Sequence, residues 1–273
     1  MNVGEAAALG VVQGLTEFLP VSSSAHLRIV PALAGWKDPG SAFTAVVQLG
    51  TMLAVVIYFW REIVHLVAAW VRGIFDRSVR HTAEYRMAWY VIFATIPISI
   101  LGLAFNHQIN HGARNLWLIA STMTFVGLIL LLAERVGHRD RGEDDLRLRD
   151  GLLIGVAQSA ALVPGVSRSG ATITAGLFRG LERTAAARFS FLLSIPAVVL
   201  SGGYELKDVG KSGGPGMGVT GLAAVLAFIV GIASIHWLLR YLTRHSTGVF
   251  VAYRVVLGVV LFALLANGTI TAT

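Results

Sequence analysis

The sequence predicts an all-α integral membrane protein built of two inverted-topology repeats, each a re-entrant helical hairpin followed by three transmembrane helices. Three observations support this fold class. Apolar runs with little or no charge recur along the 273 residues, two similar segments are interrupted by proline and serine, and arginine collects in alternate connections. We therefore expect one membrane domain over residues 1–273, with repeat one at about 1–135 and repeat two at about 148–268.

The composition disfavours a soluble helical protein with buried core helices. Hydrophobic residues make up 55% of the chain, charged residues 14%, and the mean hydropathy is +0.69. A soluble domain needs more polar surface than this. The net charge is +7, but the basic residues lie between the apolar runs, where the positive-inside rule explains them. No nucleic-acid partner is expected. The absence of cysteine excludes disulfides and thiolate metal sites.

Full spans are predicted where apolar residues continue for about 20 positions, the length of helix that crosses a hydrocarbon core of ~30 Å. Leu116–Ala133 and Val219–Leu239 carry no Asp, Glu, Lys or Arg and are the clearest cases. The predicted spans are roughly 41–60, 87–105, 116–133, 187–203, 219–239 and 249–266.

Two segments, Val3–Ala34 and Gly151–Gly180, are apolar at their edges but broken in the middle. The first break reads Leu-Pro-Val-Ser-Ser-Ser at 19–24, and the second reads Pro-Gly-Val-Ser-Arg-Ser-Gly at 164–170. Proline removes a backbone donor and disrupts the preceding helical turn. Irregular backbone at membrane depth is tolerated only where protein or a wet cavity surrounds it. Both segments are therefore predicted to be re-entrant helix–loop–helix hairpins.

The same two segments resemble each other. Gly10-Val11-Val12-Gln13 matches Gly155-Val156-Ala157-Gln158, and at the same offset Ser22 meets Ser167 and Ser24 meets Ser169. This similarity predicts a tandem duplication. A unit with an odd number of spans must repeat in the opposite orientation, as in many transporters.

Charge in the connections predicts the orientation. Arginines concentrate in 72–86 and 134–150, which two spans separate, so both connections are expected on the cytoplasmic side. Connections 106–115 and 202–218, with both chain ends, are then extracytoplasmic. The first hairpin would enter from outside and the second from the cytoplasm, so that the two tips meet near the midplane in a site that opens toward the extracytoplasmic side.

Gln13 and Glu17 are four residues apart and share a helix face just before the first break. A carboxylate at membrane depth is costly unless it has a partner. Glu17 is therefore either paired for structural reasons, located near the interface, or a metal ligand or general base.

Ser22, Ser23, Ser24 and His26 follow directly. A hydroxyl with a nearby imidazole is the minimum for an activated oxygen nucleophile. Serines also commonly cap a helix such as the one expected near Ala25. Beside Glu17 we favour chemistry, with His26 as a base, a leaving-group acid or a nucleophile.

Ser167-Arg168-Ser169-Gly170 is the strongest local feature. An arginine at the tip of an intramembrane loop needs an anion, and the start of a helix with small residues leaves N–H groups open to one. Arginine also suits bidentate contacts with phosphate. Ser167, Ser169, Gly170 and Thr172 would add hydrogen bonds. The alternative is that Arg168 pairs internally with Glu17.

These motifs resemble those of the undecaprenyl-diphosphate phosphatases, the bacitracin-resistance protein family of bacteria. Residues 13–26 are similar to the family's first motif and residues 164–172 to its second, in the same order. The similarity extends through the chain, including Gln48-Leu49-Gly50 and Phe189-Ser190-Phe191-Leu192-Leu193.

The resemblance implies hydrolysis of undecaprenyl diphosphate to undecaprenyl phosphate and inorganic phosphate, which recycles the lipid carrier for cell-wall synthesis. It also implies a divalent cation, Mg or Ca, with Gln13 and Glu17 binding the metal or activating the nucleophile. Ser23 would be the favoured nucleophile, with His26 and water as the alternatives. His26 would otherwise assist, and Arg168 would hold the diphosphate, with Ser22 and Ser24 nearby.

Two departures from the family pattern bear on this. Many members have Glu at the position of Gln13, which supplies a second charge to a metal site. Many also have Thr-Gly where this chain has Ser24-Ala25, and Ala25 has less backbone freedom than glycine.

The competing hypothesis is an inverted-repeat transporter or lipid flippase that binds an anionic substrate without cleaving it. A purely structural role would leave the charged hairpin tips unexplained. Membrane lipid and a prenyl diphosphate are the expected partners, and a homodimer is left open.

Overall fold

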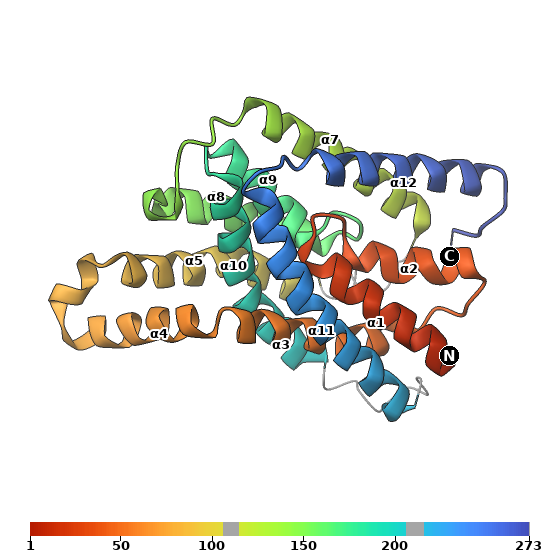
Figure 1. Cartoon of the computed structure of the whole chain (residues 1–273), viewed down its shortest axis with the longest axis horizontal. Helices are drawn as coiled ribbons and strands as arrows, with labels where there is room; N and C mark the ends of the chain where they lie inside the picture. The colour runs from red at the N-terminus through yellow and green to blue at the C-terminus, as the bar shows by residue number, and fades with distance from the viewer. Residues whose placement is uncertain (106–114, 206–215, 273) are drawn as a thin grey trace.

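The computed structural model describes residues 1–105, 115–205 and 216–272, and in this part the chain forms eleven α-helices with short 3-10 turns between them. The described residues form no named β-strand, and one isolated bridge joins Arg141 to Leu181. The all-α class predicted from the apolar runs is therefore confirmed (Figure 1).

The helices follow the chain in this order: α1 Val3–Phe18, α2 Ser23–Ala34, α3 Gly40–Tyr58, α4 Trp60–Phe75, η1 Arg77–His81, α5 Ala83–Ala104, α7 Leu116–Val136, η2 Glu143–Asp145, α8 Leu148–Ser159, η3 Ala160–Leu162, α9 Arg168–Phe178, α10 Arg183–Glu205, α11 Met217–Leu242 and α12 Gly248–Ala266.

Four of these helices, α5, α7, α11 and α12, are long and apolar enough to cross a membrane, and they match four predicted spans. Their lengths of 22, 21, 26 and 19 residues correspond to about 30–40 Å at ~1.5 Å per residue. The protein is a multi-pass membrane protein. The prediction for 187–203 falls within α10, which is not among these four and carries Arg183 and Arg188 in its first turns.

The predicted span 41–60 is incomplete as stated. The chain bends by 73° between Tyr58 and Trp60, and a second helix, α4, continues to Phe75. If the bent pair is one broken span, the count of candidate spans rises to five. Helical hydrogen bonds continue on both sides of Phe59. Its N–H donates to the Val55 carbonyl at 3.0 Å, and its carbonyl accepts from the Ile63 N–H at 2.9 Å.

The two interrupted segments fold as helix–break–helix units at the predicted places. α1 and α2 are separated at 19–22, and α8 and α9 at 160–167. Each of the four helices has 16 residues or fewer, and none of them is among the helices that could cross a membrane alone. Ser22 and Ser167, the last residues before α2 and α9, both have a positive φ, at 75° and 72°.

Close backbone contact fixes the first helix of each unit. A Cβ on Gly10 would lie 2.4 Å from the Ala223 carbonyl oxygen of α11, and one on Gly155 would lie 2.3 Å from that of Ala94 in α5. Glycine is required at both positions because any side chain would push the helices apart. The same residue type thus docks α1 on α11 and α8 on α5.

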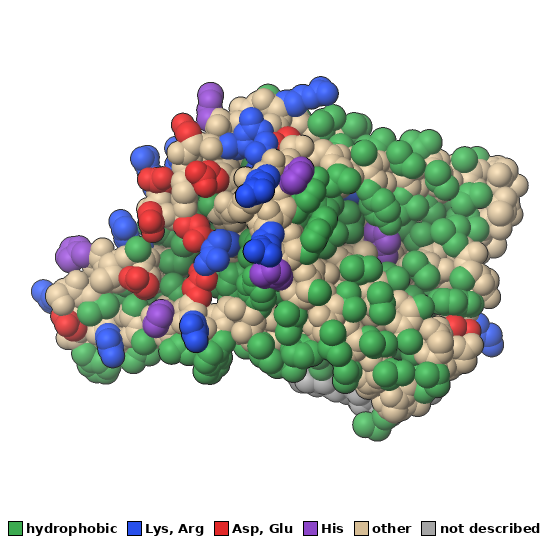
Figure 2. All heavy atoms as spheres, in the orientation of Figure 1, with side chains coloured by type: hydrophobic (Ala, Val, Ile, Leu, Met, Phe, Trp, Pro, Cys, Tyr) green, Lys and Arg blue, Asp and Glu red, His purple; other side chains and the backbone are tan. Residues whose placement is uncertain are grey.

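The two ends of the molecule differ in charge. Both termini lie at the right-hand end in Figure 1, whereas Figure 2 shows most charged side chains over the left-hand part and mainly hydrophobic ones elsewhere. The predicted connections 106–115 and 202–218 lie largely outside the described residues. Large apolar side chains are exposed along the helices, for example Val64, Val67 and Val71 of α4. Such exposure is expected where lipid replaces water.

Candidate active site

The tips of the two interrupted units meet. Arg168, the first residue of α9, donates through Nη2 to Oε1 of Glu17 in the last turn of α1. The Glu17 side chain is 7% exposed and that of Arg168 is 16% exposed. The predicted meeting of an acidic tip and a basic tip is therefore observed. This contact is the one that the alternative interpretation of Arg168, internal pairing with Glu17, predicted. A bound anion would have to compete with Glu17 for the guanidinium.

Glu17 also organises the first break. Its Oε2 accepts a hydrogen bond of 2.6 Å from the Ser23 hydroxyl and one of 3.0 Å from Nε2 of Gln13. The carboxylate therefore faces the first residue of α2, with Arg168 on its other oxygen. A carboxylate at this distance from a hydroxyl can accept its proton.

His26 has a different environment from the one predicted. Its Nδ1 donates to the Ser22 carbonyl at 2.7 Å, so the neutral ring accepts through Nε2 from the Tyr253 hydroxyl at 2.6 Å. The His26 and Tyr253 rings also stack at 5.5 Å. Both ring nitrogens are thus occupied by groups other than Ser23, whose hydroxyl bonds Glu17 instead.

The remaining predicted hydroxyls form matching pairs in the two breaks. Ser22 and Ser24 are 3.2 Å apart through Oγ, and Ser167 and Ser169 are 3.1 Å apart. Ser169 also donates to the Leu19 carbonyl at 3.0 Å, which joins the two breaks directly.

At the start of α9, the Ser167 hydroxyl caps the helix by accepting from the Gly170 N–H at 3.0 Å. Thr172 lies one turn further on, fully buried, with its hydroxyl 2.6 Å from that of Ser190. Its hydroxyl therefore faces α10 rather than the Glu17 carboxylate.

Comparison with known proteins assigns the chain to a family. The model of the family described as bacitracin resistance protein BacA matches residues 6–260. The chain is 52% identical over 277 residues to an undecaprenyl-diphosphatase of Mycobacterium ulcerans, with all of both chains covered. It is 51% identical to undecaprenyl-diphosphatase 2 of Frankia casuarinae (99% and 97% covered) and 48% identical to an undecaprenyl-diphosphatase of Thermobifida fusca (99% and 93% covered).

The chain belongs to the bacitracin resistance protein BacA family. Its membership accounts for both long motifs at once, because the Glu17 region and the Arg168 region lie within the matched residues. The suspected resemblance of the sequence motifs is therefore confirmed.

A divalent cation fits the residues around Glu17. Oε1 of Gln13 is buried and has no hydrogen-bond partner in the described part of the chain, while Nε2 lies between Glu17 and Thr51 Oγ1, 3.4 Å away. The two ends of an amide have the same shape, so a half-turn would direct Oε1 toward Glu17. Carboxylate, amide and hydroxyl oxygens are the ligands that Mg and Ca prefer.

No group of three or more His, Asp or Glu side chains in the described ranges could hold a metal by itself. Magnesium in particular is commonly held by one or two carboxylates together with substrate phosphates. The protein donors found here suit that mode.

Sequence reasoning missed three site residues. Thr51 and Tyr253 sit in apolar spans with nothing unusual around them, so only tertiary contact reveals them. Arg254 is fully buried in α12 and contacts both breaks. A charge in the middle of an apolar span is a signal that could have identified it.

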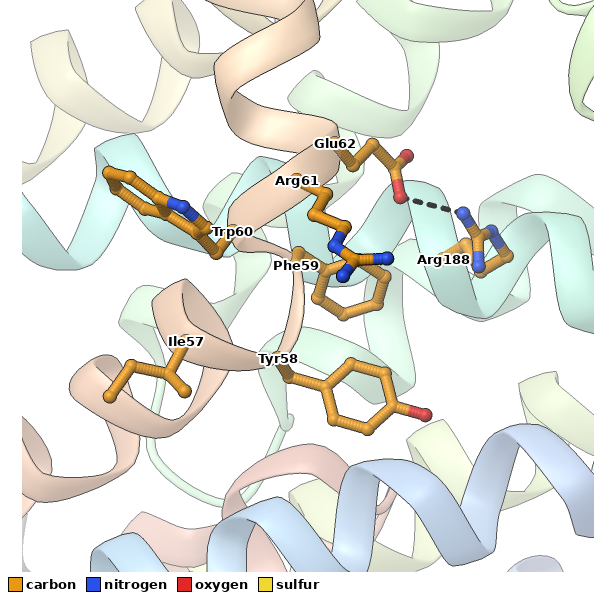
Figure 3. A pocket seen from close by; sticks show the side chains of 7 residues that line it. All are labelled: Ile57, Tyr58, Phe59, Trp60, Arg61, Glu62 and Arg188. Carbon is orange, nitrogen blue, oxygen red and sulfur yellow. Dashed lines mark hydrogen bonds and ion pairs between the residues drawn. The ribbon is translucent and has the colours of Figure 1, made fainter.

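A separate cavity of about 320 Å³ lies at the α3–α4 bend (Figure 3). Arg188 of α10 pairs there with Glu62 at 2.6 Å and sits 5.5 Å from the Phe59 ring centroid. None of the residues that line this cavity is a predicted site residue. They are Ile57, Tyr58, Phe59, Trp60, Arg61, Glu62 and Arg188.

Proposed function

We propose that this protein is an undecaprenyl-diphosphatase of the bacterial cell membrane, which hydrolyses undecaprenyl diphosphate to undecaprenyl phosphate and inorganic phosphate. The undecaprenyl phosphate returns to cell-wall synthesis as lipid carrier. The observation that carries the proposal is the single carboxylate, Glu17, bonded to a hydroxyl on one oxygen and to a guanidinium on the other. In this arrangement a base, Glu17, directly contacts both a potential nucleophile, Ser23, and an anion-binding group, Arg168.

Ser23 is the proposed nucleophile. Its Oγ attacks the terminal phosphorus, its proton passes to Glu17, and the bond from that phosphorus to the bridging oxygen breaks as undecaprenyl phosphate leaves. Water then attacks the phosphorus of the phosphoserine and the bond from that phosphorus to Ser23 Oγ breaks. Glu17 returns its proton to Ser23 Oγ, and the protons of the water leave with the inorganic phosphate. Phosphoryl transfer needs mainly positioning and charge stabilisation, which matches a site with few groups.

Arg168 is proposed to leave Glu17 and hold the diphosphate, with the hydroxyls of Ser22, Ser24, Ser167 and Ser169 and the start of α9 nearby. Gln13 and Glu17 would hold the divalent cation, which neutralises phosphate charge when bound. His26 would keep the end of the first break in place through its bond to the Ser22 carbonyl.

We further propose that the chain consists of two inverted repeats and that the site opens to the extracytoplasmic side. Support comes from the similar, positive φ angles of Ser22 and Ser167 and from the matching glycine contacts of α1 and α8. The end that carries most charge would face the cytoplasm, as the positive-inside rule requires. The first unit would then enter from the side of the termini.

The test is phosphate release from undecaprenyl diphosphate by the purified protein in detergent with Mg or Ca. No gradient exists in detergent, so release separates an enzyme from a transporter. Ser23→Ala, Glu17→Gln and Arg168→Ala should each lower kcat/KM by on the order of 10²–10³ or more. The matched controls are Ser121→Ala and Arg240→Ala, two exposed residues outside the site, which should keep wild-type rates. Full activity in any folded site variant would contradict its proposed role.

Labelled substrate distinguishes the two routes of attack. Terminal phosphate that stays bound to the wild-type chain, but not to Ser23→Ala, supports attack by Ser23. Turnover with no bound label under rapid quenching indicates direct attack by water, with Glu17 as its base.

A further inference from the structure

We infer that Arg254 is a positioning residue that holds the two interrupted hairpins in register, so that Ser23 and Arg168 meet at Glu17. The consequences for catalysis rest on the proposed function. The contacts of Arg254 with the two breaks, which we call the Arg254 clamp, do not depend on it. Arg254 lies in α12, and its side chain is fully buried.

Its guanidinium reaches both breaks at once. Nη1 donates to the Pro20 carbonyl at 3.1 Å, and Nη2 donates to the carbonyls of Gly165 at 2.8 Å and Val166 at 3.1 Å. These acceptors belong to segments that lie more than a hundred residues apart in the chain. One side chain therefore fixes the orientation of three peptide groups in two loops.

The same guanidinium is anchored from behind by α7. Nε donates to the Met123 carbonyl at 3.1 Å and Nη2 approaches that of Thr122 at 3.4 Å. The Thr122 hydroxyl in turn donates to the Pro164 carbonyl at 2.7 Å. α7 and α12 thus form a rigid support, and Arg254 connects this support to both hairpins.

The chemistry of arginine explains why this residue is used. A buried cation is costly unless its donors are satisfied, and all the acceptors found for Arg254 in the described residues are backbone carbonyls. The planar guanidinium presents five donors in a fixed fork, whereas a lysine ammonium is a single point on a flexible stem. Lysine keeps the charge but cannot span Pro20 and Gly165 with the same rigidity.

The carbonyls of the two breaks that Arg254 binds lie within three residues of Ser23 and Arg168 in the chain. Val166 precedes Ser167 and Arg168, and Pro20 lies two residues before Ser22 and three before Ser23. Because Ser22 and Ser167 hold a positive φ, the backbone there must be stabilised by its surroundings. Loss of the clamp should therefore displace Ser23 Oγ and Arg168 relative to Glu17.

The first experiment compares Arg254→Lys and Arg254→Met with the control Arg240→Met, an exposed arginine near the end of α11. We expect Arg254→Lys to fold, with a Tm close to wild type, and to lose about 10²-fold in kcat/KM, the size of effect that a ~1 Å misplacement produces. In a double-mutant cycle, Arg254→Lys should cost far less when Arg168 is already Lys, because both act through the same contact. Wild-type kcat/KM in Arg254→Lys, or additive losses in the cycle, would overturn the inference.

A second experiment needs no activity. The chain has no cysteine, so Leu15→Cys in α1 and Val163→Cys in the second break, two exposed positions, can carry spin labels. The distance distribution between the labels should be narrow in the otherwise wild-type protein and broader in Arg254→Lys. An unchanged distance distribution in Arg254→Lys would contradict the clamp. If the wild-type protein releases no phosphate but the distribution still broadens, the proposed function fails and the clamp stands.

Discussion

At the scale of single residues, Glu17 connects three groups of the site, because its two oxygens bond Arg168, Ser23 and Gln13. Glu17, Ser23 and Arg168 could be predicted from the sequence, because charged and hydroxyl side chains stand out in interrupted apolar segments. Tyr253 could not, because its neighbours in the sequence are ordinary for a span. Its role depends on α12 lying beside the start of α2, which only the fold decides.

Tyr253→Phe tests that contact. The variant removes the hydroxyl that bonds His26 Nε2 at 2.6 Å and keeps the stacked ring. We expect the free energy of unfolding to fall by about 1 kcal/mol, the net value of one hydrogen bond, with a smaller loss of activity than in Ser23→Ala. Thermal unfolding in detergent measures this. Tyr241→Phe is the matched control, because the Tyr241 hydroxyl makes no hydrogen bond to the described residues. Equal melting of the two variants would argue against the His26 contact.

At the scale of elements, the two helix–break–helix units could be located from sequence because proline, glycine and serine mark their breaks. The α3–α4 bend could not, since 56–62 contains neither proline nor glycine. The direction of α4 depends on distant contacts, among them the pairing of Glu62 with Arg188. A sequence pattern thus predicts where a helix breaks when the break is local, and misses it when tertiary contacts cause it.

Gly155→Ala tests how α8 is held on α5. The added Cβ would lie 2.3 Å from the Ala94 carbonyl oxygen, so the helices must separate. We expect the free energy of unfolding to fall by about 1–3 kcal/mol, as for other overpacked interfaces. Thermal unfolding in detergent measures this change. Gly221→Ala in α11 is the control, because its Cβ would meet nothing within 4 Å. The control should be neutral or slightly stabilising, since alanine favours helix over glycine. A neutral Gly155→Ala would mean that the interface is looser than described.

At the scale of the whole molecule, arginine–carboxylate pairs tie together the elements at the charged end. Asp150, whose side chain is fully buried, accepts from Arg141 at 2.6 Å and from Arg179 at 2.7 Å. Arg188 joins Glu62 of α4 to Glu143 of the α7–α8 connection. The sequence indicates the charge of this end but not these partners, because most of the pairs join residues of different elements, such as Arg188 of α10 with Glu62 of α4.

Asp150→Asn should remove the charge that both arginines share. Breaking a fully buried pair costs about 3–5 kcal/mol, but Arg141 and Arg179 are 22% and 33% exposed and can regain water. The cost should therefore be smaller, and the variant should still melt below wild type. Asp144→Asn, an exposed neighbour at the same end, should melt like wild type. If the two variants have the same Tm, the Asp150 network contributes little to stability.

The orientation in the membrane is the property that the whole charge distribution decides. Lys37 follows α2, which ends on the side of the two termini in Figure 1, and Arg77 lies in η1 at the charged end. Both residues are exposed. In the cysteine-free chain, Lys37→Cys should react with a membrane-impermeant maleimide in intact cells with a permeable outer layer. Arg77→Cys should react only after the inner membrane is opened. The positive-inside rule requires this order, because arginine-rich connections stay in the cytoplasm. The reverse order would place Ser23 and Arg168 in a site entered from the cytoplasm, and labelling of both positions in intact cells would contradict the separation of the two ends by a bilayer.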